Sequence, residues 1–93
     1  MAHPSSEPLV TVSATLPAEV ALHARPAGLF VKEAAGLGCA VTVIANGKRA
    51  DARSILQLLA LGARGGTEVV IEVSGDGAAE AAEYLARFVA ELT

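Results

Sequence analysis

Hydrophobic and polar residues alternate in separate stretches of the chain, which is the pattern of strands with one buried face. These strands are expected over residues 9–16, 39–45, 48–52 and 68–74. Asn46-Gly47 separates the second from the third, and this dipeptide is the strongest short signal for a β-hairpin. Residues 1–8 contain two Pro and two Ser and no periodicity. We therefore expect a flexible lead over residues 1–8 and a folded domain over residues 9–93.

Between the strands, apolar residues recur at spacings of three and four, which predicts helices. One begins at Ala24 and stops at Gly36, one runs from Ser54 to about Leu61, and one follows residues 75–77. Their apolar stripes are Ala27, Phe30, Val31 and Ala34 in the first and Ala81, Leu85, Phe88 and Leu92 in the last. Ser54 and Gln57 fit a capping box, with Ser54 as N-cap. The element order βαββαβα predicts an α+β fold, a two-layer sandwich with the helices on one side of the sheet.

Composition and charge exclude several classes of protein. The formal net charge is −3, and the basic residues are scattered apart from Lys48-Arg49, which argues against nucleic-acid binding. Cys39 is the single cysteine, so neither an internal disulfide nor a thiol-rich metal site is expected, and we predict no metal or cofactor. Without a secretory signal or an apolar run long enough for a bilayer, we expect a cytoplasmic protein with no direct membrane insertion. Nothing in the sequence demands more than a monomer, so a monomer is the expectation.

His23 is the strongest candidate for chemistry, because it lies where a loop meets the first predicted helix. The first N–H groups of a helix have no internal partner and carry partial positive charge, so they attract anions. Imidazole is a nucleophile near neutral pH and can later act as a leaving group. Arg25 adds a planar cation that suits phosphate oxygens. The plainer alternative is a polar loop residue near a helix N-cap.

Two segments resemble the signatures of one family. Leu22-His23-Ala24-Arg25-Pro26-Ala27 is similar to the active-site signature of HPr, the histidine-containing phosphocarrier of the phosphoenolpyruvate-dependent sugar phosphotransferase system. Residues 46–48 and 52–62 resemble the second signature of that family, and the resemblance extends from about Leu9 to Leu92. It implies an open-faced sandwich in which three helices cover one face of a four-stranded antiparallel sheet.

The same resemblance implies roles for individual residues. His23 corresponds to the histidine that is phosphorylated on Nδ1, as a pros-phosphohistidine intermediate, and Arg25 to the arginine that assists transfer. Ser54 corresponds to the serine that an ATP-dependent kinase, HPr kinase/phosphorylase, modifies in many Gram-positive relatives. A related regulatory paralogue lacks the active histidine, which is present here. Gly28 departs from the Ser or Thr that is frequent in relatives.

In such a relay, phosphorylated enzyme I donates the phosphoryl group, which comes ultimately from phosphoenolpyruvate, and enzyme IIA domains accept it. The protein would turn over only as part of that relay, so whether it counts as an enzyme stays open. The second predicted helix is too apolar to bury all its sides, which indicates a docking surface beside His23. The expected partner-binding residues are Arg25, Leu29, Lys32, Ile55, Leu56 and Leu59.

Three alternatives remain open at this point. The chain is a carrier in a nitrogen-type regulatory or fructose-dedicated branch, or a regulatory binding module that acts through Ser54 and a transcription factor. The third alternative is a free-standing small-molecule-binding domain of similar α+β layout.

Overall fold

The sheet has four strands in the order β1-β4-β2-β3, and each neighbouring pair is antiparallel. The computed structural model describes residues 9–93, so the lead predicted over residues 1–8 lies outside the described residues. The strands are β1 (Leu9–Thr15), β2 (Ala40–Ala45), β3 (Lys48–Asp51) and β4 (Glu68–Ser74). The predicted strands and the antiparallel α+β architecture are confirmed.

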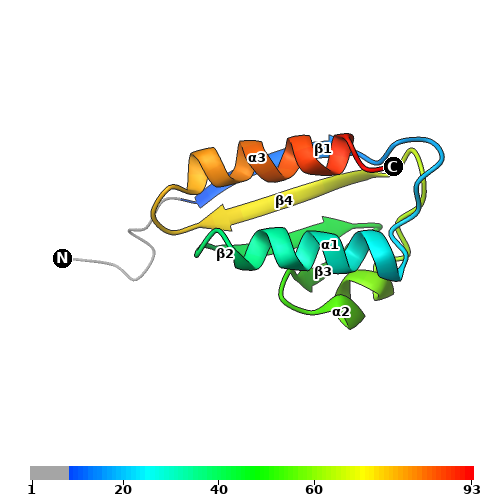
Figure 1. Cartoon of the computed structure of the whole chain (residues 1–93), viewed down its shortest axis with the longest axis horizontal. Coiled ribbons are helices and arrows are strands. Elements are labelled where there is room, and N and C mark those ends of the chain that lie inside the picture. Colours follow the sequence, from blue (N-terminus) through cyan, green and yellow to red (C-terminus); the bar gives the residue numbers. More distant parts are fainter. Residues whose placement is uncertain (1–8) are drawn as a thin grey trace.

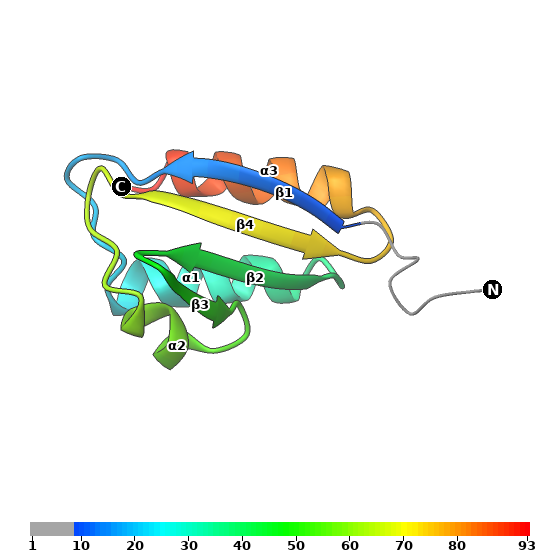
Figure 2. The ribbon, with the colours of Figure 1, turned by 180° about the vertical axis from the view of Figure 1, so that it is seen from behind.

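Helices α1 (Ala24–Ala35) and α3 (Ala78–Ala90) lie antiparallel across one face of the sheet (Figure 1). The opposite face is not covered by a helix in residues 9–93 (Figure 2). The short helix α2 (Ile55–Ala60) lies at the β3 edge and packs against α1 and β3. None of the helices in the described part of the chain has the length and apolar run needed to cross a bilayer.

The core lies between the sheet and the helices, with the central strand β4 contributing its alternate residues Val69, Ile71 and Val73. The helical stripes match the prediction with two differences. Val31 on α1 is only half-buried and packs against the margin of the core. On α3, Val89 is buried, whereas Phe88 lies at the edge of the core against Phe30, with ring centroids 6.4 Å apart.

The hairpin between β2 and β3 also fixes the end of α2. Asn46 and Gly47 have φ angles of 53° and 74°, the two positive values that a type I′ turn requires. The Asn46 side-chain amide donates to the carbonyl of Leu61 at 2.9 Å, and Lys48 Nζ lies 3.4 Å from the carbonyl of Ala60. These contacts satisfy carbonyl groups that the helix end leaves without a partner. The turn thereby ties α2 to the sheet.

Residues 16–22, which join β1 to α1, pair with residues 63–67, which lie between α2 and β4, and we call this pairing the loop clamp. Its backbone hydrogen bonds run from Leu16 N–H to Thr67 O at 3.0 Å, Gly66 N–H to Leu16 O at 2.9 Å and Leu22 N–H to Ala63 O at 3.0 Å. Gly65 makes the close approach possible, because a Cβ atom at this position would lie 2.0 Å from the carbonyl oxygen of Ala18. The loop clamp therefore holds in place the segment that leads into α1.

We predict that Gly65→Ala lowers the free energy of unfolding by about 1–3 kcal/mol. The new methyl group would overlap backbone atoms of Ala18, so one of the two loops has to move. Urea denaturation followed by circular dichroism measures the change.

Gly28→Ala is the matched control, since it is the same substitution on α1. A Cβ atom there would meet Ile55 Cδ1 at 3.8 Å, an ordinary contact, and alanine favours the helix. We expect this variant to be more stable than the original by about 0.5–1 kcal/mol. A Gly65→Ala variant as stable as the original chain would contradict the close approach in the loop clamp.

Candidate functional site

His23 is the N-cap residue of α1, at the exit of the loop clamp. Its backbone is extended, with φ −82° and ψ −173°, and its carbonyl accepts the N–H of Ala27 at 2.9 Å. Its own N–H donates to the carbonyl of Ala21 at 2.8 Å, so the main chain is fixed on both sides. The side chain is exposed and makes no cap hydrogen bond. Within residues 9–93, the imidazole ring is left without a hydrogen-bond partner, and both ring nitrogens are open to a visiting group.

The N-terminus of α1 presents unpaired donors beside this ring. The N–H groups of Ala24 and Arg25 find no acceptor among residues 9–93, and Pro26 has no N–H to satisfy. The first turn also contains no acidic residue that would offset the positive end of the helix dipole. A phosphoryl group bonded to His23 would therefore meet free N–H donors and a favourable field.

The Arg25 side chain extends from the first turn of α1 toward Thr93, the last residue of the sequence. Its Nη2 donates to the main-chain oxygen of Thr93 at 2.5 Å, a contact between residues 68 positions apart. Figure 1 shows that the end of α3 and the start of α1 lie at the same end of the molecule. His23, Arg25 and Thr93 line one open hollow, together with Glu19, Val20, Ala21 and Pro26. No sequence pattern pointed to Thr93 or Glu19, because neither lies in a motif.

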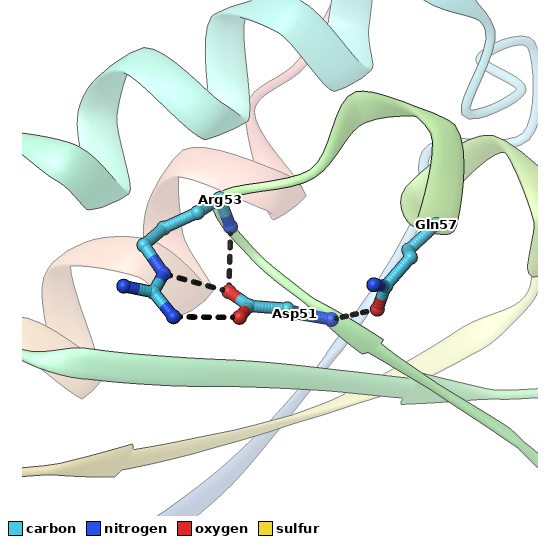
Figure 3. Close-up of polar contacts among 3 residues, drawn as sticks. All are labelled: Asp51, Arg53 and Gln57. Atoms are coloured by element: carbon cyan, nitrogen blue, oxygen red, sulfur yellow. Dashed lines mark hydrogen bonds and ion pairs between the residues drawn. The ribbon is translucent and has the colours of Figure 1, made fainter.

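Ser54 is the N-cap of α2, and half of the predicted capping box forms around it. The Ser54 hydroxyl oxygen accepts the N–H of Gln57 at 3.1 Å, as expected. The reciprocal bond is absent, and this part of the prediction is wrong. The Gln57 carbonyl oxygen instead accepts the N–H of Asp51 at 2.8 Å (Figure 3), while the N–H of Ser54 donates to the carbonyl of Asp51 at 2.9 Å. The Gln57 side chain bonds to the edge strand β3 because the Ser54 N–H already has an acceptor.

Asp51 and Arg53 form a paired contact next to Ser54 (Figure 3). Arg53 Nη2 lies 2.9 Å from one carboxylate oxygen of Asp51, and both Arg53 Nε (3.2 Å) and its backbone N–H (2.9 Å) donate to the other. These hydrogen bonds lower the pKa of the Asp51 carboxyl from its ordinary value, with the side-chain bond as the main cause. Arg53 is thus engaged with Asp51 in the turn that leads into α2.

The predicted partner-binding residues divide into three groups: exposed apolar residues, one half-buried apolar residue and two cations. Leu29, Ile55 and Leu56 are 40%, 41% and 79% exposed, which is unusual for large apolar side chains. Leu59 is half-buried and packs against the core. We call Leu29, Ile55 and Leu56 the apolar patch. Arg25 and Lys32 are exposed on α1, so two cations accompany the patch.

Comparisons with known proteins point to one family. A family model described as the PTS HPr component phosphorylation site matches residues 10–91. The phosphocarrier protein HPr of Streptomyces coelicolor is 48% identical over 71 residues, which are 75% of this chain and 76% of that protein. The HPr-like protein Crh of Bacillus subtilis is 43% identical over 70 residues, 75% of this chain and 82% of that protein. A crystal structure of HPr from Bacillus anthracis superposes with a TM-score of 0.81 at 33% identity, covering 87% of this chain and 96% of that one.

We predict that Ser54→Ala lowers the free energy of unfolding by about 1 kcal/mol. The substitution removes the oxygen that accepts the Gln57 N–H and leaves that donor without its partner. Thermal or urea unfolding measures the loss. Ser54→Thr keeps a hydroxyl at the N-cap and should retain most of the stability. Equal losses in both variants would argue against the cap as the cause.

Proposed function

The chain belongs to the HPr family, the phosphocarriers of the phosphotransferase system, and on that premise we propose that His23 carries the phosphoryl group. One observation supports this most directly. His23 is an exposed N-cap residue whose ring has no partner in residues 9–93, and it stands next to unpaired helix N–H groups. Arg25 lines the same hollow and supplies a permanent positive charge.

Phosphoryl transfer requires few catalytic groups on this chain, because the donor and the acceptor are proteins that contribute their own active-site residues. The Nδ1 lone pair of His23 attacks the phosphorus of the donor, and the bond from phosphorus to the donor's leaving group breaks as the new P–N bond forms. In the second step an acceptor attacks the same phosphorus, and the His23 ring leaves with the electron pair of the P–N bond. Phosphoryl transfer depends chiefly on position and charge. The helix N-terminus and Arg25 meet both requirements by stabilising negative oxygens beside His23.

Arg25 has a further property that suits transfer. Its guanidinium uses one N–H group on Thr93, so the other donors of the fork stay available to phosphate oxygens. The contact with Thr93 restrains the side chain in advance, which lowers the entropy lost when a phosphate oxygen is bound.

Partners of this chain are expected to be the enzymes of the phosphotransferase system. We assign enzyme I as donor and enzyme IIA domains as acceptors. The apolar patch on α1 and α2 offers the apolar centre of a transient interface, and Arg25 and Lys32 offer charges that orient an approaching acidic surface. The open hollow at His23 agrees with this, since a phosphoryl group has to reach the active sites of two different proteins.

We predict that the protein gains one acid-labile phosphoryl group when it is incubated with phosphoenolpyruvate, Mg²⁺ and enzyme I of the same organism. Intact-protein mass spectrometry detects the gain. His23→Ala should show none, because the nucleophile is missing.

Arg25→Ala serves as the graded variant in the same experiment. It leaves His23 in place but removes the cation, and we expect a rate of phosphorylation about tenfold to a hundredfold lower. His3 lies outside the described residues, so His3→Ala is the matched histidine control and should be phosphorylated like the original. A phosphoryl gain that persists in His23→Ala would refute the assignment.

Regulation through Ser54 is a second proposed function, and a specific observation favours it. The Ser54 hydroxyl lies directly before Ile55 and Leu56, two members of the apolar patch. A phosphate there would add about 1.5–2 negative charges at the edge of the docking surface, which opposes the desolvation of an apolar interface. The similarity to Crh of Bacillus subtilis, a catabolite repression protein, accords with a regulatory use of this fold.

We predict that Ser54→Asp weakens binding to enzyme I by about threefold to thirtyfold, owing to the charge placed beside the patch. Aspartate is also a good N-cap, so α2 should stay folded. Isothermal titration calorimetry gives the dissociation constants, and Ser54→Thr is the neutral control. Unchanged affinity for Ser54→Asp would mean that the start of α2 lies outside the interface.

A further inference from the structure

The loop before His23 is ordered by its own contacts, although it contains no helix or strand. The Val20 N–H donates to the carbonyl of Pro17 at 3.0 Å, which closes a turn with Ala18 and Glu19 at its corner. Val20 and Leu22 are both buried, so side chains anchor the loop on either side of Ala21. The loop clamp adds the bond from Leu22 N–H to Ala63 O. Glu19 therefore projects from a turn whose backbone is fixed.

Glu19 brings a negative charge to the hollow that contains His23. It lines that hollow together with His23 and Arg25, and its side chain is exposed. The salt bridges among residues 9–93 are Arg49–Glu72 and Arg53–Asp51, so Glu19 has no cation paired to it within this part of the chain. Arg25, the cation of the hollow, directs its Nη2 to Thr93 instead.

We propose that Glu19 sets the transfer potential of the phosphoryl group on His23, by opposing the negative charge that this group brings into the hollow. This inference rests on the proposed function of His23. A phosphoryl group carries between one and two negative charges near neutral pH. The start of α1 and Arg25 attract that charge, and Glu19 repels it. The sum of this attraction and this repulsion determines the free energy that is released when the phosphoryl group is transferred from His23 to an acceptor.

The effect of Glu19 is electrostatic and involves no bond to the carboxylate. In each transfer the P–N bond to His23 breaks, phosphorus bonds to the acceptor, and the His23 ring keeps the electron pair. Glu19 raises the free energy of the phosphorylated form relative to the unphosphorylated form, because the like-charge repulsion exists only when the phosphoryl group is present. A carrier that bound the group with attraction alone would accept it readily and release it reluctantly, so an opposing charge favours delivery.

The test is the equilibrium constant for phosphorylation by phosphoenolpyruvate, measured with catalytic enzyme I, Mg²⁺ and excess pyruvate. Intact-protein mass spectrometry gives the ratio of phosphorylated to free protein. For Glu19→Gln we expect this constant to rise about threefold or more at low salt, because a like-charge repulsion is removed. The difference should shrink at 1 M salt, where the screening length falls to about 3 Å. Glu19→Asp keeps the charge and should resemble the original.

Glu83→Gln is the matched control, since Glu83 is an exposed residue of α3 outside the hollow and the change in net charge is the same. It should leave the equilibrium constant unaltered. An unchanged constant for Glu19→Gln, or an equal rise for Glu83→Gln, would overturn the role of Glu19. If the original chain gains no phosphoryl group on His23, the proposed function itself fails, and that result differs visibly from an unchanged constant.

Discussion

The backbone pairing between residues 16–22 and residues 63–67 is the constraint on which the site depends. β1 and β4 are adjacent in the sheet, so the segments that follow the one and precede the other meet at the same end of the molecule. The bonds of Leu16 and Leu22 extend this pairing beyond the strands. As a result, His23 emerges at a defined place over the start of α1. The approach is as close as it is because Gly65 lacks a Cβ atom.

This arrangement explains how a site without a deep pocket can still orient the group that it binds. An enzyme that binds a small substrate encloses it, whereas a carrier between proteins has to leave the transferred group accessible. On the proposed role of His23, the hydrogen-bond donors are backbone N–H groups at the start of α1, which is rigid because its other residues are bonded within the helix. The buried stripe of α1 fixes the helix against the sheet, so the field at its end is preorganised. The core thus contributes to the site by holding a helix end still.

Sequence patterns predicted the elements well and the contacts between distant loops poorly. Alternation, the Asn46-Gly47 turn and the Ser54 cap are local features, and each corresponds to a local physical requirement that a few neighbouring residues satisfy. The contact between Arg25 and Thr93 joins residues far apart in the chain, and no local pattern encodes it. Gln57 failed as a capping-box residue for a related reason, since the edge of β3 offered its side chain an unpaired N–H on Asp51. The need for a residue without a Cβ atom at position 65 is likewise visible only once Ala18 lies opposite.

The contact between α1 and α2 relates the two proposed modification sites to each other. Ile55 Cδ1 lies close to Gly28, so the start of α2 rests on α1 little more than one turn after His23. His23 and Ser54 are the N-caps of these two helices, and the apolar patch is built from both helices. A partner that covers the patch in order to reach His23 therefore also covers the start of α2. In the proposed scheme, charge added at Ser54 acts on docking, a step that precedes the chemistry at His23. On the proposed roles, regulation and transfer are coupled through a shared surface, and the fold needs no conformational change to connect them.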